Sequence, residues 1–320
     1  MRRIFHLLGR SLLLVCSIFG ATLLLETLTF STAGEGTDAE HQRLFNESYK
    51  VFSLTLPDKL DFCGENVPMD LLDVRERLDR ELLVNTYWQS SSLLAHKRAN
   101  RWFPVIEPIL KRNGVPEDMK YIPLVESAFT NITSPAGATG FWQFMKETAK
   151  GHGLEVNDQV DERYNVEKAT QAACDYLKEA HVRYGSWAMA AASYNLGQGN
   201  IERQLGRQKT QDYFALLLPD ETSRYVFRIL AMKAIISDPD RYGFHLRARD
   251  LYPPYKTRSV DISGNVDDLN EFAVRQGTDY KTLKLLNPWL RDNALTNSAK
   301  KTYTVLLPAE GFNNQAVGDD

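Results

Sequence analysis

The chain has 320 residues, of which 43% are hydrophobic and 25% are charged, and its formal net charge is -3. This length accommodates about two or three domains, and the composition is that of an ordinary globular protein. The near balance of charge excludes the strongly basic surface that nucleic-acid-binding proteins use, so no nucleic-acid partner is expected.

The first 33 residues have the layout of a secretory signal. Arg2, Arg3 and Arg10 flank an apolar run over residues 12–25, and small residues follow at 31–33. This layout predicts export to the periplasm or cell envelope, with cleavage after residue 33. The alternative interpretation is an uncleaved anchor that associates the protein with a membrane, although the apolar run is short for a membrane span.

Export would place the remaining cysteines in an oxidising compartment. Cys63 and Cys174 are left after the signal, so one disulfide is open to them. Cys174 lies in a helical pattern, where a small buried apolar residue is the competing interpretation. The six histidines are scattered without ligand spacing and no CxxC pair occurs, so neither a metal nor another cofactor is expected.

Helical periodicity dominates the chain between residues 68 and 240. A short strand is expected before it, at residues 51–57, and a different pattern follows Pro253-Pro254. The helices are expected from Pro68, from Arg98 to Arg112, from Val166 to Tyr184, from Trp187 to Tyr194, from Asn200 and from Thr222 to Ser237. After the prolines, strands at 258–264 and 303–308 enclose helices at 266–276 and 279–286. The predicted fold class is mainly α, an all-helical domain followed by a small βααβ domain.

One segment carries the candidate chemistry. Glu126 ends an apolar helical run, a loop of small residues follows at 134–140, and Gln143 comes in a second apolar run. A carboxyl group in an apolar setting is uncommon, and a raised pKa would suit a general acid. The alternative is a helix-end residue bonded to nearby backbone. Tyr194 and Asn195, beside glycines, offer a ring for stacking and an amide for hydrogen bonds, and are equally compatible with a helix cap.

Five short motifs follow one another along the chain. They are Glu126-Ser127, Gly137-Ala-Thr-Gly-Phe-Trp-Gln-Phe-Met145, Val160-Asp161-Glu162-Arg163, Ala191-Ala-Ser-Tyr-Asn195 with Gly197 and Gly199, and Glu221-Thr222 with Tyr225-Val226. Through them, residues 98–236 resemble the lysozyme-like lytic murein transglycosylases, close to the membrane-bound D type that carries LysM modules. Residues 258–308 resemble a diverged LysM module.

The resemblance implies a division of the chain into domains. The expected parts are a signal peptide or anchor (1–33), an N-terminal segment whose helix packs on the catalytic domain (34–97), a lysozyme-like transglycosylase domain (98–245), a linker (246–257), a LysM-like domain (258–310) and a tail (311–320). The LysM-like domain is expected to add affinity for insoluble peptidoglycan and to be dispensable for cleaving soluble fragments.

The resemblance also implies a substrate and roles for residues. Glycan strands of peptidoglycan are the expected partner, and Glu126 is the expected sole catalytic acid and base, giving 1,6-anhydro ends without water. The matching residues Ser134, Gln143, Tyr194, Asn195 and Tyr225 are expected to bind the substrate, with Tyr225 also orienting Glu126. The alternatives are a hydrolytic muramidase that uses Asp161 or Glu162 as a second acid, and a non-catalytic peptidoglycan-binding protein.

Overall fold

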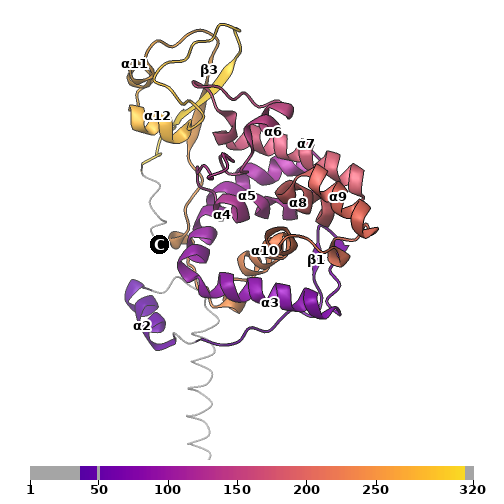
Figure 1. Ribbon diagram of the computed structural model, residues 1–320. Coiled ribbons are helices and arrows are strands. Elements are labelled where there is room, and N and C mark those ends of the chain that lie inside the picture. Colours follow the sequence, from indigo (N-terminus) through magenta and orange to yellow (C-terminus); the bar gives the residue numbers. More distant parts are fainter. Residues whose placement is uncertain (1–36, 49–50, 314–320) are drawn as a thin grey trace, which may run out of the picture. The chain divides into compact units, whose positions relative to one another are not determined.

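The computed structural model describes residues 37–48 and 51–313, which fall into two compact units. The first unit ends at Phe52 and holds helix α2 (Asp38–Ser48). The second unit begins at Ser53 and holds all the other elements of the described residues (Figure 1). The expected signal at 1–33 and most of the expected tail lie outside the described residues. Within the described ranges, no helix combines the length and the apolar character that crossing a membrane requires.

The second unit is mostly helical. It opens with a small antiparallel hairpin, β1 (Asp61–Phe62) and β2 (Glu65–Asn66). Its main helices are α3 (Leu72–Tyr87), α4 (Gln89–Arg112), α5 (Tyr121–Ser127), α6 (Lys146–Gly151), α7 (Val166–Tyr184), α8 (Trp187–Leu196), α9 (Gln198–Gln208) and α10 (Asp220–Ser237). Short 3-10 turns lie at η1 (Glu117–Lys120), η2 (Glu162–Tyr164), η3 (Tyr213–Ala215), η4 (Asp240–Tyr242) and η5 (Ala248–Asp250).

The C-terminal part has the order strand, helix, helix, strand. Its elements are β3 (Thr257–Ile262), α11 (Leu269–Arg275), α12 (Tyr280–Leu286) and β4 (Tyr303–Pro308). β3 and β4 pair antiparallel, with Val260 opposite Val305. The predicted mainly α fold class, with a small βααβ unit after the helices, is therefore confirmed.

Two local expectations differ from the structure. The strand expected at 51–57 is absent: Leu54 and Leu56 pack against the helical core, but no strand in the described residues pairs with this segment. The extended pairing lies instead in the β1–β2 hairpin, where Phe62 is buried. Helix α4 begins at Gln89 rather than Arg98. Its first turns bury the small residues Ser92 and Ala95, which give a weak apolar signal in the sequence.

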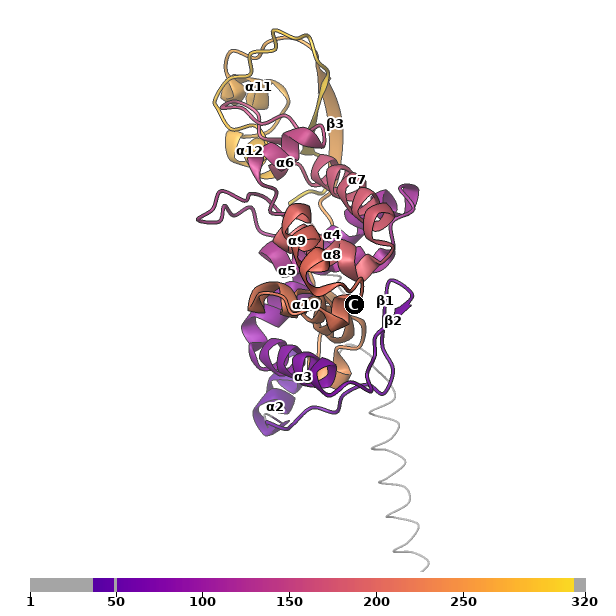
Figure 2. The same ribbon diagram turned by 45° about the vertical axis from the view of Figure 1, so that its right-hand side comes forward.

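The larger core lies among α3, α4, α7, α8 and α10. Helix α10 lies between α3 and α8 in both views (Figures 1 and 2) and packs against each of them. Ala188 and Ala190–Ala192 of α8 are buried, and such small side chains let neighbouring helices approach closely. This packing places the C-terminal end of α8 and the middle of α10 near the end of α5.

The second core belongs to the βααβ unit but is not closed by it alone. Residues from the strands, helices and connections of 262–307 form most of this cluster. Val160 and Tyr164, from the loop before α7, are buried in the same cluster. The helical part of the chain therefore contributes side chains to the core of the C-terminal part.

Cys63 and Cys174 are both free thiols, so they do not form the disulfide that export would permit. Cys174 is buried on α7, and this burial raises the pKa of its thiol to about 12. It therefore serves as a small apolar residue, as the helical pattern around it indicated.

Candidate active site

Glu126 lies near the end of the short helix α5. The helix ends at Ala128, whose φ of 48° is left-handed, and Phe129 follows with a φ of 53°. Such backbone costs an L-residue about 1–2 kcal/mol, so the surrounding contacts must hold it. The Ser127 hydroxyl supplies one of these contacts, because it donates to the carbonyl oxygen of Phe141 at 2.9 Å. The end of α5 is thereby joined to the loop that follows it.

The carboxyl group of Glu126 is half-buried and bonded to one tyrosine. The Tyr225 hydroxyl, on α10, donates to Oε1 of Glu126 at 2.6 Å. Burial raises the pKa of Glu126 above its usual value of 4.5, while the Tyr225 hydrogen bond and the charge of Arg228 oppose the rise. Because burial has the largest effect, Glu126 keeps its proton to a higher pH than an exposed glutamate does.

Two further residues of α10 act on Glu126. Arg228 donates from Nη2 to the carbonyl oxygen of Val125 at 3.1 Å, and its charge favours the ionised carboxylate. Glu221, exposed in the first turn of α10, adds a like charge that raises the Glu126 pKa. Neither was predicted as a site residue. Both lie three or four residues from Tyr225, on one face of the helix, and this spacing is the one sequence signal that could have found them once Tyr225 was chosen.

Tyr194 and Asn195 lie in the last turn of α8. The Tyr194 hydroxyl donates to the carbonyl oxygen of Trp142 at 2.6 Å, and burial, followed by the Glu126 charge, raises the pKa of Tyr194 well above its usual value. Oδ1 of Asn195 accepts from the Thr222 hydroxyl at 2.7 Å. The helix cap is Gly197, so the capping role open to Tyr194 and Asn195 falls to a glycine.

The other end of α8 is held by the hairpin. The Glu65 carboxylate accepts from the Ser186 hydroxyl at 2.9 Å and from the Ala188 N–H at 3.2 Å. It also accepts from the N–H of Trp187. A negative charge on these free N–H groups stabilises a helix N-terminus, so β2 fixes the helix that carries Tyr194 and Asn195.

Ser134 and Gln143 lie on the loop between α5 and α6. Oγ of Ser134 accepts from the Ala138 N–H at 3.0 Å, which closes a turn within the loop. Gln143 has a left-handed φ of 49°, and its Nε2 donates to the carbonyl oxygens of Ile132 at 3.1 Å and Gly140 at 2.7 Å. Because both amide hydrogens are bound inside the loop, Oε1 is the atom of the Gln143 amide that is left to accept a further hydrogen bond.

Asp161 and Glu162 are each paired with a basic side chain. Asp161 forms a two-point ion pair with Arg163, with distances of 2.9 and 2.7 Å. Glu162 pairs with Lys168 and accepts from the Glu155 N–H at 2.8 Å. The structure therefore joins Glu126 directly to Tyr225 and brings Tyr194 close to it, whereas Ser134 and Gln143 bond within their loop.

No cluster of three or more His, Cys, Asp or Glu side chains suited to a metal ion occurs in residues 37–48 and 51–313.

Comparison with known proteins gives two domain matches and several relatives. Residues 103–217 match the transglycosylase SLT domain, and residues 258–311 match the soluble lytic transglycosylase C-terminal LysM-like domain. The membrane-bound lytic murein transglycosylase D of Escherichia coli strain K12 is 28% identical over 243 residues, which is 73% of this chain and 52% of that protein. The protein of the same name from Escherichia coli O6:H1 strain CFT073 gives the same values.

The chain spans about half the length of these curated relatives. Among solved structures, the 70 kDa soluble lytic transglycosylase of Escherichia coli is 22% identical, with a TM-score of 0.38, over 48% of this chain and 27% of that one. Residues 103–217 are therefore similar to the transglycosylase SLT domain, and residues 258–311 are similar to the LysM-like domain found at the C-terminus of soluble lytic transglycosylases.

Proposed function

We propose that the protein cleaves the MurNAc-β-1,4-GlcNAc bond of peptidoglycan as a lytic transglycosylase and leaves 1,6-anhydro-MurNAc ends. The observation that carries this proposal is the half-buried Glu126, whose pKa is raised by burial and whose carboxyl group accepts a hydrogen bond from Tyr225. The SLT and LysM-like domain matches support peptidoglycan as the substrate.

Glu126 acts first as an acid and then as a base. Its proton passes to the glycosidic oxygen, whose bond to C1 of the muramic acid breaks. The acetamido oxygen of the same sugar stabilises the positive charge at C1. The Glu126 carboxylate then takes the proton of the C6 hydroxyl, and the C6 oxygen bonds to C1. Glu126 ends protonated again, and no water is consumed.

The contacts of the other acids favour this scheme over hydrolysis. A hydrolase needs a second carboxylate to activate water or attack C1. Asp161 is committed to Arg163, and Glu162 is committed to Lys168 and to backbone. Glu221 acts on Glu126 through its charge, and we assign it to tuning the acid.

The same proposal assigns the residues that contact the substrate, the domain boundaries and the cellular location. Tyr225 orients Glu126, Tyr194 and Asn195 flank the reacting sugars, Gln143 accepts a hydrogen bond through Oε1, and Ser134 shapes the loop. The catalytic domain covers residues 98–245 and the LysM-like domain 258–310. The relatives named for a membrane-bound enzyme support a place in the cell envelope.

Mass spectrometry of the products from purified sacculi tests the reaction. Digestion in ¹⁸O-labelled water should release disaccharide-peptides that are lighter than reducing fragments by one water and carry no label. Labelled reducing ends would instead establish a muramidase. Glu126→Gln should fold and bind sacculi but release no products; release at the parent rate would refute the role of Glu126, and binding without release by the parent would indicate a non-catalytic protein.

A further inference from the structure

The LysM-like domain is joined to the helical domain by main-chain hydrogen bonds. Val160 forms an antiparallel bridge with Leu290, and the N–H of Asp161 donates to the carbonyl oxygen of Trp289 at 2.9 Å. The N–H of Arg291 donates to the carbonyl oxygen of Gln159 at 2.8 Å. Residues 159–161 therefore pair with residues 289–291 much as one strand pairs with another.

Apolar packing reinforces this pairing. Val160 is 1% exposed and Leu290 0%, and both belong to the LysM-like core. The guanidinium carbon of Arg291 lies 4.2 Å from the centre of the Tyr164 ring, which is buried in the same core. Removing the LysM-like domain would expose Val160 and Tyr164, which a loosely tethered domain would not cause.

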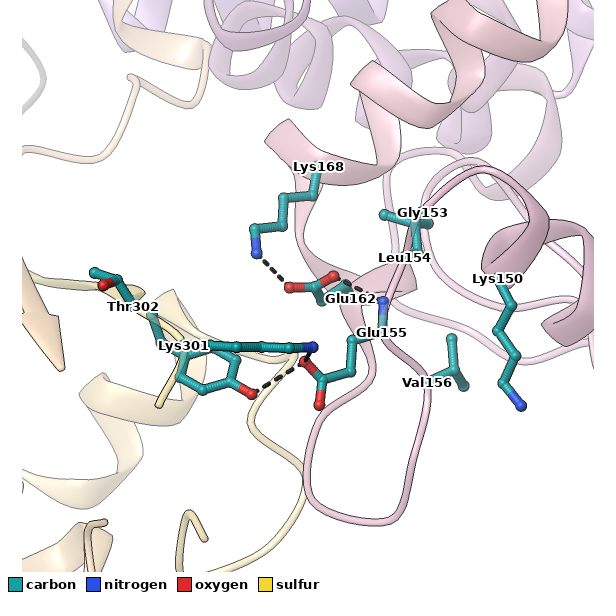
Figure 3. Close-up of a pocket in the computed structure, with 10 residues that line it drawn as sticks. Lys150, Gly153, Leu154, Glu155, Val156, Glu162, Lys168, Lys301 and Thr302 are labelled. Carbon is teal, nitrogen blue, oxygen red and sulfur yellow. Dashed lines mark hydrogen bonds and ion pairs between the residues drawn. The ribbon is translucent and has the colours of Figure 1, made fainter. Parts of the chain in front are cut away.

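The polar edge of the junction lines a cavity of about 510 Å³ (Figure 3). Oε2 of Glu155 accepts from Lys301 at 2.9 Å and from the Tyr303 hydroxyl at 3.0 Å. On the other side of the cavity Lys168 points to Glu162. Lys301 and Lys168 are about half-exposed, so these ion pairs contribute little, and the main-chain bonds and the shared core dominate the junction.

Arg163 connects this junction to the loop between α5 and α6. Its side chain is buried and held by both carboxylate oxygens of Asp161. Nη1 donates to the carbonyl oxygens of Gly137 at 3.0 Å and Phe144 at 3.2 Å. One planar guanidinium thus spans the loop that contains Gln143, and a lysine ammonium cannot reproduce that geometry.

Backbone contacts continue the same connection. A Cβ placed on Gly140 would lie 2.0 Å from the carbonyl oxygen of Arg163, so the loop and residue 163 are in direct contact. The Tyr164 hydroxyl bonds with that of Thr133 at 3.0 Å, at the start of the loop. Asp161 is the link, since its N–H is bound by the LysM-like domain and its side chain is bound by Arg163.

We propose that Arg163 is a positioning residue for glycan cleavage and that the LysM-like domain, through Asp161, holds it in place. This inference rests on the proposed function. It departs from the sequence-based expectation that the LysM-like domain is dispensable for soluble fragments, because here the domain supports the loop that contacts the substrate.

Arg163→Lys tests the first part. On a soluble glycan fragment its KM should rise at least about tenfold, because a displaced Gln143 loses its contact with the sugar, while kcat changes less. Hydrogen exchange of the amides at 133–144 should accelerate. Arg183→Lys, at an exposed ion pair between α7 and α9, is the matched control and should change neither quantity. Parent-like KM and exchange in Arg163→Lys would overturn the proposal.

Leu290→Ala tests the second part in the full chain. It should accelerate exchange at 155–164 and 133–144, whereas Leu269→Ala, an equal loss from the same core, should act only within 257–308. Unchanged exchange of residues 133–144 in Leu290→Ala would refute a role of the LysM-like domain. Exchange does not require turnover, so a parent protein without activity would refute the proposed function while leaving this comparison decisive.

Discussion

Tyr225 and Glu126 share a hydrogen bond of 2.6 Å that joins α10 to α5. Glu126 lies inside the matched SLT range of 103–217, and Tyr225 lies beyond it. Helix α10 is in turn held by α3, where the buried Glu81 accepts from Nε of Arg224 at 2.7 Å. The surroundings of the acid therefore depend on helices that flank the matched domain on both sides.

Replacing Tyr225 with phenylalanine should move the pH profile of the enzyme. The hydroxyl favours the ionised form of Glu126, so its loss raises the pKa of that carboxyl further. The proton of the acid then persists to higher pH, and the alkaline limb of kcat/KM should move up by about one pH unit, the equivalent of one charged hydrogen bond. Tyr184→Phe, on the far end of α7, should leave the limb in place. A downward movement in Tyr225→Phe would contradict the assignment.

Glu126→Gln should become more stable relative to the parent as pH rises. The folded-state pKa of Glu126 is raised above 4.5, so its contribution to stability is full below that value and is lost as pH rises through the folded pKa. Glutamine does not titrate. The difference in Tm, variant minus parent, should therefore grow upward from about pH 4.5 in thermal scans at several pH values. A difference that shrinks with rising pH would mean that the carboxylate, not the acid, is favoured in the fold.

Gly140→Ala should disrupt the loop between α5 and α6 and impair cleavage, whereas Gly137→Ala should not. Both glycines have positive φ, 78° and 89°, so each substitution costs about 1–2 kcal/mol of backbone strain. At Gly140 the new Cβ would also meet the Arg163 carbonyl oxygen at 2.0 Å, whereas nothing lies within 4 Å at Gly137. Thermal unfolding and cleavage of a soluble fragment separate the two effects. Similar losses in both variants would show that strain alone matters.

Glu65→Ala should destabilise the protein by about 1–2 kcal/mol, because the first N–H groups of α8 lose their acceptor. Since α8 carries Tyr194 and Asn195, KM should rise as well. Glu147→Ala removes an exposed acid whose ion pair with Lys150 spans 3.8 Å, and its effect should stay within about 0.5 kcal/mol. Urea unfolding of both variants checks this. Equal unfolding midpoints would show that Glu65 does not stabilise the helix that carries Tyr194 and Asn195.

The sequence predicted those features of the fold that depend on residues close together along the chain. Helix α7 has the predicted bounds because Asn165 accepts from the Lys168 N–H at its start and Gly185, with a φ of 70°, ends it. Glu126 was predicted as a site residue from its setting in an apolar helix beside a loop of small residues. These features lie within a few residues of each other along the chain.

Long-range contacts account for what the sequence did not reveal. Arg228 acts on Glu126 from a helix about a hundred residues later, and only tertiary packing brings the two together. Arg163 stands in a recognised motif, yet its role depends on carbonyl oxygens of Gly137 and Phe144. Val160 and Tyr164 gave no sign that they complete the core of another domain.

That shared core has a practical consequence for recombination. In a chimera that transplants residues 258–310 onto another helical enzyme, the LysM-like core would have a cavity in place of Val160 and Tyr164. In the donor protein, the same two apolar side chains would become exposed to solvent. Grafts that carry residues 155–164 along with the C-terminal module should yield soluble hybrids. The boundary of the transferred part is therefore set by the contacts of the shared core and not by the proline-containing connection before residue 258.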